Sequence, residues 1–167
     1  MSLLSLVPVL VVISSAVPGI LIILLGEPRA RARIILNLAG AVLKLALVFV
    51  MLLVGDTYPF EARYPLVGDL DFVLRGDDLA MLFVTLSAGL WLLTTIYAIG
   101  YFENQPHQSR FFGFFSLCVS ATTGIALAGN LITFLVFYEI LTLSTYPLLV
   151  HYGDNKSIRA GRTYLAY

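Results

Sequence analysis

Charge is scarce in this sequence, and that scarcity argues against a soluble protein. Ten lysines and arginines and ten aspartates and glutamates make up 12% of the 167 residues, whereas a soluble globular domain carries roughly 25%. Hydrophobic residues reach 59%, which is more apolar surface than a soluble fold of this length can enclose. The net charge is zero, and no basic block is present that would serve a nucleic acid.

Cysteine and recognisable catalytic motifs are scarce as well. Cys118 is the single cysteine, so no intrachain disulfide can form. The sequence has no zinc spacing, phosphate-binding loop, nucleotide fingerprint or nucleophile elbow, and no motif for a flavin, haem, quinone or iron–sulfur cluster. We therefore expect no metal and no cofactor, and any NADH–quinone oxidoreductase or hydrogenase activity would belong to partner subunits. A cleaved signal peptide is not expected either, because no charge precedes Glu27.

Long apolar runs are what the sequence does contain. A helix that crosses the hydrocarbon core needs about 20 apolar residues. The stretch 111–150 has 40 residues, with Glu139 as its one acidic or basic side chain. It must therefore fold back, and Gly129-Asn130 is the best candidate for the turn. The predicted spans are 3–25, 34–54, 79–99, 111–128 and 131–150.

These spans predict an all-α fold, a polytopic transmembrane helix bundle in a single domain, 1–167. Five spans are complete, and residues 162–167 resemble the start of a sixth helix. Because the chain stops as that helix opens, we expect an N-terminal fragment of a longer transporter subunit. The acidic segment 55–78 is expected to form an ordered loop or hairpin outside the membrane.

The basic residues are unequally divided between the two ends of the predicted bundle. Seven lie in the segments 26–33, 100–110 and 151–162, and two lie in the segment 55–78. Basic residues near the ends of spans mark the cytoplasmic side. We therefore expect a multi-pass protein of the inner (plasma) membrane, with the N-terminus and the acidic segment on the extracytoplasmic side.

Glu139 has the clearest chemical implication. It lies near the middle of the span 131–150, where a carboxylate costs several kcal/mol unless it is paired, hydrated or protonated. A carboxyl group in such surroundings changes its protonation state with its neighbours, as a proton relay requires. Thr142 and Tyr146 share its helix face and extend a polar stripe toward the cytoplasmic end. The alternative is a structural carboxylate bonded to a neighbouring helix.

Two further residues are candidates for proton transfer. Lys44 is a second intramembrane charge, at the centre of the span 34–54, and it could exchange protons, balance Glu139 or serve only the structure. His151 follows the span 131–150 and titrates near neutral pH, so it could pass protons between water and the polar stripe. Simple solvation is the alternative for His151. Nothing in the sequence shows that Lys44 meets Glu139.

Four segments resemble one known family. They are FVLRGDDLAMLF (72–83), IYAIGYF (96–102), RFFGFFSLCVSATTGIALAGNLITFLVFYEILTLSTYPLL (110–149) and IRAGRTYLAY (158–167). In this order they resemble the third to sixth helices of the antiporter-like membrane subunits shared by respiratory complex I, Mrp-type Na⁺/H⁺ antiporters and membrane-bound hydrogenases. The pair Tyr138-Glu139 and the run TLSTYP resemble the D-type subunits of Mrp antiporters and hydrogenase-type members more than complex I members.

The resemblance carries implications for mechanism. It aligns Glu139 with a carboxylate that pairs with a lysine on a later helix and drives proton transfer. Family members have about fourteen helices in two inverted repeats, so this chain would match only the N-terminal third, and Lys44 matches no family position. The resemblance implies that the other subunits of a multi-subunit complex are partners, together with the lipid bilayer and protons, and with Na⁺ or K⁺ as candidate coupled ions.

Two functional hypotheses remain. The first is a proton or monovalent-cation translocating membrane subunit of an antiporter or respiratory-type complex, with the intramembrane Glu139 as proton relay. The second is a non-transporting structural subunit, or a truncated fragment, that anchors such a complex. A helix with a central lysine, encoded downstream or by a neighbouring gene, would favour the first.

Overall fold

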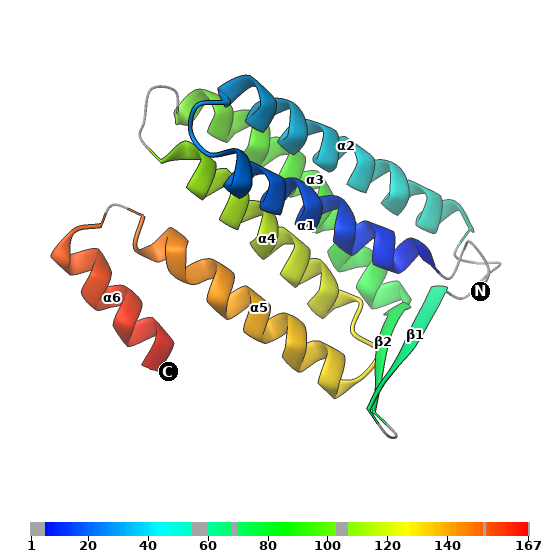
Figure 1. Cartoon of the computed structure of the whole chain (residues 1–167). Coiled ribbons are helices and arrows are strands. Elements are labelled where there is room, and N and C mark those ends of the chain that lie inside the picture. The colour runs from blue at the N-terminus through cyan, green and yellow to red at the C-terminus, as the bar shows by residue number, and fades with distance from the viewer. Residues whose placement is uncertain (1–5, 55–59, 68–69, 103–106, 152, 167) are drawn as a thin grey trace.

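The computed structural model describes residues 6–54, 60–67, 70–102, 107–151 and 153–166. Two long helices are followed by a β-hairpin and four further helices (Figure 1). The helices are α1 (Val7–Leu25), α2 (Ala30–Val54), α3 (Asp78–Tyr101), α4 (Gln108–Ala126), α5 (Leu131–Leu149) and α6 (Asn155–Ala166). The strands are β1 (Phe60–Val67) and β2 (Leu70–Gly76).

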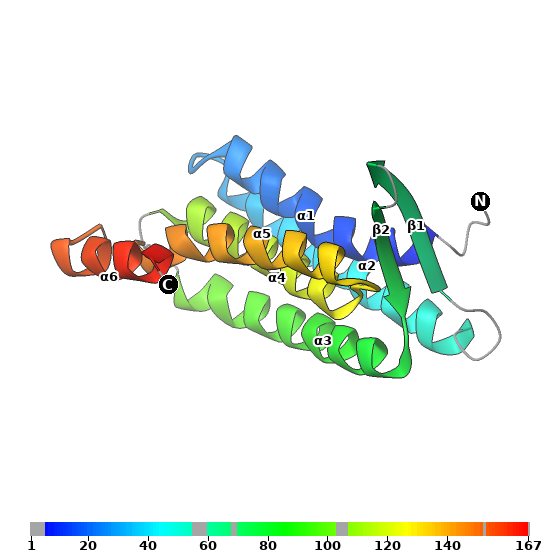
Figure 2. The same cartoon turned by 90° about the horizontal axis from the view of Figure 1, so that it is seen from below.

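Helices α1 to α4 form a closed ring. Each contacts the next, and α4 returns to contact α1. Helix α5 packs on α4 outside this ring, and α6 packs on α5 (Figures 1 and 2). Small residues let membrane helices approach closely: a Cβ on Gly124 of α4 would lie 2.3 Å from the ring of Phe137 on α5. This contact fixes the distance between the two helices.

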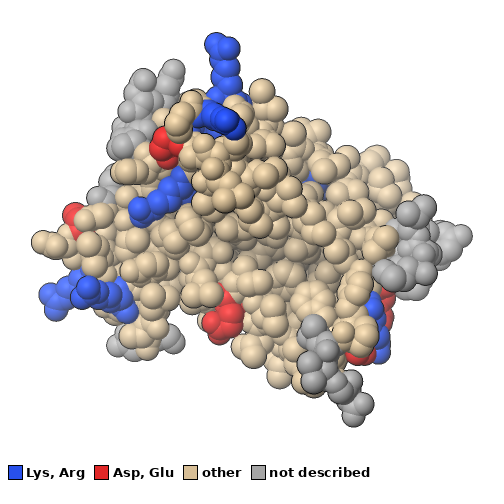
Figure 3. Space-filling view, viewed as in Figure 1, with Lys and Arg blue, Asp and Glu red and all other residues tan. Residues whose placement is uncertain are grey.

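The outer surface of the bundle is apolar. Large exposed hydrophobic side chains follow α1, α2, α3 and α5, and Figure 3 shows most charged side chains near the ends of the molecule. These four helices are long and apolar enough to cross a membrane. The prediction of a multi-pass membrane protein built as a helix bundle is confirmed at this level.

The predicted count of five complete spans is not confirmed. The described residues form six helices, four of which have the length and apolarity of a span. Helix α4 has 19 residues, as α1 does, but its sequence is rich in serine and threonine and includes Arg110. Its polar side chains are accommodated because α1, α2, α3 and α5 all pack around it.

The predicted helical fold is confirmed for most of the described residues, with one β element: part of the segment 55–78 forms a β-hairpin. Strands β1 and β2 pair antiparallel from Phe60 opposite Gly76 to Val67 opposite Leu70. Phe60, Ala62 and Leu74 are buried against the end of the bundle. The sequence analysis allowed a hairpin here, and its remaining residues, 55–59 and 68–69, lie outside the described residues.

The predicted turn at Gly129-Asn130 is confirmed, and it is tied to the hairpin. The Arg75 amide donates to the Leu127 carbonyl at 2.7 Å, and the Gly129 amide donates to the Val73 carbonyl at 2.8 Å. The Asn130 side chain donates to the Asp71 carbonyl at 2.6 Å. The turn therefore extends the sheet and is held at the same end of the bundle as β2.

The sixth helix begins earlier than predicted. The sequence analysis placed its opening at 162–167, whereas α6 begins at Asn155 and only its last part falls in that range. Its start is capped, because the Ser157 amide donates to the Asp154 carboxylate at 2.9 Å. A search for apolar runs does not find this helix, because its sequence is polar. The first predicted span, 3–25, corresponds to α1, and its residues 3–5 lie outside the described residues.

Candidate functional site

Among the described residues, the ammonium of Lys44 is the most enclosed charged group. It lies near the middle of α2, and its side chain is completely buried at 0% exposure. Nζ donates to the hydroxyl of Thr123 on α4 and lies 3.5 Å from the Val119 carbonyl. It also lies 5.5 Å from the ring centre of Trp91 on α3. Three helices thus surround one cation.

All of these contacts to Lys44 are neutral. The Thr123 hydroxyl accepts from Nζ and donates to the Val119 carbonyl at 2.7 Å, and the Trp91 ring offers the negative face of its π system. Among the described residues, no carboxylate lies within ion-pair distance of Nζ. A buried ammonium without a counter-ion is expensive, so the neutral contacts of Lys44 are what stabilise its charge within this bundle.

Close packing positions this group. A Cβ on Gly40, one turn from Lys44 on α2, would lie 2.7 Å from Pro18 of α1 and 3.2 Å from the Trp91 ring. Glycine at this position therefore lets α1, α2 and α3 meet. The indole of Trp91 is 1% exposed and is held beside the lysine.

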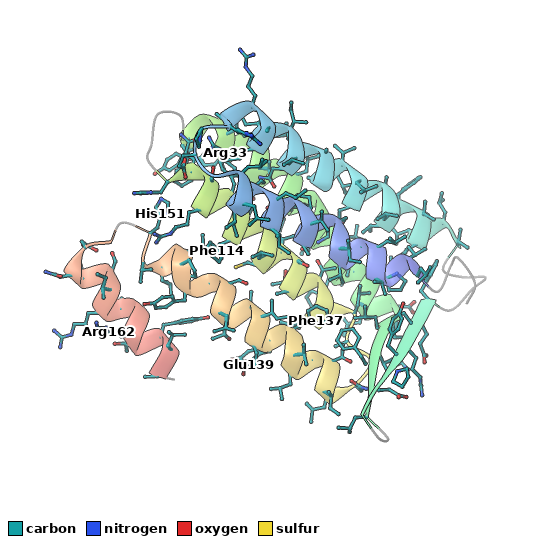
Figure 4. All side chains as sticks on the ribbon, in the orientation of Figure 1. Arg33, Phe114, Phe137, Glu139, His151 and Arg162 are labelled. Carbon is teal, nitrogen blue, oxygen red and sulfur yellow. The ribbon has the colours of Figure 1, made fainter. Side chains whose placement is uncertain are left out.

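Glu139 lies elsewhere. It is exposed on α5, and Figure 4 shows its side chain pointing away from the bundle. The buried face of α5 carries Thr133, Phe137 and Ser144 and packs against α4. Lys44 faces the interior of the ring, and Glu139 faces outward beyond α4, so this chain does not bring them together.

The two predicted members of the polar stripe beside Glu139, Thr142 and Tyr146, make contacts within this chain. The Thr142 hydroxyl donates to the Tyr138 carbonyl of its own helix at 3.0 Å. Tyr146 packs on α6, because a Cβ on Gly161 would lie 2.9 Å from its ring. Both residues are half-buried. The exposed carboxylate therefore lies on an apolar face that continues through Val136, Ile140 and Leu143.

His151 lies at the opposite end of the bundle from the hairpin, in an aromatic cluster. Its ring centre lies 6.0 Å from Phe111, 6.2 Å from Phe102 and 6.5 Å from His107. Burial lowers the pKa of His151, and the nearby charges of Arg110 and His107 lower it further, while Glu27 acts in the opposite direction. The imidazole is thus biased toward its neutral form.

Besides the contacts of Lys44, the bundle has a second buried polar cluster, around Arg33, at the end opposite the hairpin. Arg33 is 4% exposed, and its guanidinium donates to the Ser109 hydroxyl at 2.8 Å and to the Gln108 side chain at 2.6 Å. Glu27 lies 3.6 Å from it and also accepts from the Ser109 amide at 3.0 Å. The link between α1 and α2 is thereby fastened to the first turn of α4.

The sequence analysis missed several of these residues. Thr123, Trp91 and Arg33 were not singled out, because a hydroxyl, an indole or a charge at the end of a span is unremarkable alone. One signal was present: Arg33, Asn37 and Lys44 are separated by four and seven residues, so they share one helix face.

Residues 66–112 match the family described as NADH-Ubiquinone oxidoreductase (complex I), chain 5 N-terminus. The resemblance to the antiporter-like membrane subunits is confirmed. The A/B subunit of a probable K(+)/H(+) antiporter of Rhizobium meliloti is 33% identical over 92 residues, which are 55% of this chain. NADH-quinone oxidoreductase subunit L of Mycobacterium tuberculosis is 35% identical over 79 residues, or 47% of this chain. These relatives are of both antiporter and complex I type, so the assignment to the D-type subunits stays a prediction.

The antiporter-like relatives are much longer than this chain, which covers 9% of the first and 12% of the second. The fold has a counterpart in the membrane-bound sulfane sulfur reductase, an archaeal respiratory membrane complex. The TM-score is 0.69 at 18% identity, over 84% of this chain and 22% of that one. The helix arrangement of this chain is thus similar to that of part of one chain in this complex.

Proposed function

We propose that this chain acts within a proton or monovalent-cation translocating membrane subunit of an antiporter or respiratory-type complex, with Glu139 as a proton relay. The observation that carries the proposal is the position of Glu139, midway along α5 on an exposed apolar face. A carboxylate facing lipid at this depth costs several kcal/mol. That cost is relieved when the carboxylate meets a basic group of another helix, or when it is protonated.

The relatives support this proposal through what they are. They include one subunit named as a probable K(+)/H(+) antiporter and one subunit of an NADH-quinone oxidoreductase. Lys44 is proposed as a second proton-transfer group, since its ammonium is buried among neutral partners. His151 is proposed to exchange protons with water at the end of α5. Partner membrane subunits would supply the remaining charges and any redox chemistry.

A topology in the plasma membrane belongs to the same proposal. We infer that α1 to α5 all cross, within one transmembrane domain, with the hairpin and the N-terminus extracytoplasmic. The excess of basic residues at the end formed by the α1–α2 link, the start of α4 and α6 supports it. Single cysteines at Leu70 and Asn155, both exposed, test it in a Cys118→Ser background. A membrane-impermeant maleimide should label them from opposite sides, and labelling from the same side would refute the topology.

Ion-driven pH change in vesicles that hold the assembled complex tests the function. Glu139→Gln keeps the volume of the side chain and cannot titrate, so coupled translocation should be abolished while assembly is retained. Glu139→Asp keeps the carboxylate and should retain partial activity. Undiminished translocation with Gln would refute the relay and favour the alternative, a structural subunit that anchors such a complex.

A further inference from the structure

A row of buried polar side chains joins α2 to α4 in three steps. Arg33 donates to Ser109 at 2.8 Å. Asn37 accepts from Ser116 at 2.9 Å, and Lys44 donates to Thr123. On α4 the three partners are seven residues apart, so they share one helix face as their counterparts on α2 do.

This row reaches from one end of the bundle to its middle. Arg33 and Lys44 are eleven residues apart on α2, a rise of about 16 Å, which is about half of the hydrocarbon thickness. Among the described residues, no hydrogen bond joins one of these three steps to the next. A continuous path therefore needs something polar in the gaps.

Buried polar atoms without a partner lie on α2 and α3, the helices next to this row. Among the described residues, Asn37 Nδ2, Trp91 Nε1 and Thr95 Oγ1 are buried with no hydrogen-bond partner. Asn37 and Trp91 are 1% exposed and Thr95 is 0% exposed. A buried polar atom left unsatisfied costs about 1–3 kcal/mol, and bound water is the usual way in which proteins satisfy such groups.

The positions of these three residues along α2 and α3 can be compared with those of Lys44 and Arg33. Trp91 is beside Lys44 and also faces Gly40, one turn closer to Arg33 on α2. Helix α3 runs antiparallel to α2, so Thr95, one turn beyond Trp91, lies nearer still to the Arg33 end. Asn37 follows on α2. By their positions along α2 and α3, Asn37 and Thr95 thus lie at levels between the Lys44 and Arg33 steps, and Trp91 lies at the level of Lys44.

We propose that water molecules bind between α2, α3 and α4 and form a hydrated path from the Arg33 cluster to Lys44. The path is a binding site for water, independent of the outward-facing Glu139. Its use for protons rests on the proposed function. A proton then moves by exchange of hydrogen bonds along the water molecules and is accepted by Lys44 when that amine is neutral, with no oxidation or reduction.

Silver-ion accessibility of introduced cysteines tests the path. The small Ag⁺ ion binds thiolates, which form only where water solvates the sulfur. The sample is the full chain in membrane vesicles, with Thr95→Cys in a Cys118→Ser background. After exposure to Ag⁺ the protein is unfolded and alkylated, and thiols that have bound Ag⁺ are protected from alkylation. The matched control is Val84→Cys, because Val84 is 0% exposed on the same helix within an apolar cluster. Ser116→Cys provides a second position on the path.

We expect Thr95→Cys and Ser116→Cys to react at least 100-fold faster than Val84→Cys. Adding Asn37→Leu should slow the reaction at Thr95→Cys at least tenfold, whereas Ser14→Ala, which removes a hydroxyl bonded within α1, should leave it unchanged. The proposal would be overturned if Val84→Cys reacted with Ag⁺ at the same rate as the path positions, whether fast or slow. It would also be overturned if Asn37→Leu left the rate at Thr95→Cys unchanged. The assay needs no transport, so a hydrated path without translocation would count against the proposed function alone.

Discussion

Lys44 and Thr123 are 79 positions apart in the chain and are hydrogen-bonded in the interior of the helix ring. The bond joins α2 to α4, the one ring helix that is not apolar enough to count as a span. Its hydroxyl groups instead serve the interior, where Ser109, Ser116 and Thr123 face the polar side chains of α2. The polarity of α4 is thus explained by what it contacts.

Removing the Thr123 hydroxyl should destabilise the protein. Thr123→Val keeps the shape and leaves the buried ammonium without its hydroxyl acceptor, so we expect a loss of about 1–3 kcal/mol in unfolding free energy. Thr123→Ser should be close to wild type. In a Lys44→Met background the cost of Thr123→Val should fall below about 1 kcal/mol, since no charge is left to solvate. Unfolding in mixed detergent micelles measures the cycle, and equal costs in both backgrounds would refute the interaction.

The Arg33 cluster should be important for stability although it lies at the end of a helix. Arg33→Ala removes the guanidinium that donates to Ser109 and Gln108, so we expect a loss of about 2–4 kcal/mol in unfolding free energy. Arg31→Ala on the same turn is the matched control, because Arg31 is exposed, and should change stability by less than about 0.5 kcal/mol. The same unfolding assay compares the two, and similar values would contradict the assigned role of Arg33.

Helix packing at Gly124 should not tolerate a methyl group. Gly124→Ala would force its Cβ into the ring of Phe137, so we expect a loss of about 1–3 kcal/mol. Gly89→Ala on α3 has nothing within 4 Å of the added carbon and should stabilise by up to about 1 kcal/mol. Thermal denaturation of the two variants should shift in opposite directions. Shifts of the same sign would mean that α5 packs differently.

Stability should depend on pH through His151. Its pKa is lowered from an ordinary value of 6.5 by burial and by Arg110 and His107, so the unfolded chain binds a proton more readily than the folded one. Stability is then fully present above about pH 6.5 and is lost as the pH falls toward the folded pKa. We expect His151→Asn to weaken the pH dependence of the unfolding free energy, measured between about pH 5 and 7. An unchanged slope would show that other groups cause the dependence.

The sequence was sufficient for the features that depend on local composition. Apolar runs predicted α1 to α5, Gly129-Asn130 predicted the turn, and Lys44 and Glu139 stood out as charges in apolar segments. Their surroundings could not be predicted, because the partner of Lys44 comes from α4 and the outward direction of Glu139 depends on the packing of Phe137 against Gly124.

One wrong prediction and one undecided one have physical causes of the same kind. The start of α6 was missed because that helix is polar and is stabilised at its start by Asp154 rather than by an apolar run. The hairpin was left open because its short strands gain their stability from burying Phe60 and Leu74 on the end of the bundle, which is a tertiary effect.

The central claim is that Glu139 takes up and releases a proton during ion translocation. Infrared difference spectroscopy of the complex in vesicles, recorded between states with and without a driving ion gradient, measures this directly. We predict a carboxylic-acid C=O band that changes between the states, shifts on ¹³C-glutamate labelling and disappears in Glu139→Gln but persists in Glu27→Gln. A difference spectrum with no glutamate carboxyl band, or with a band unaffected by Glu139→Gln, would contradict the account.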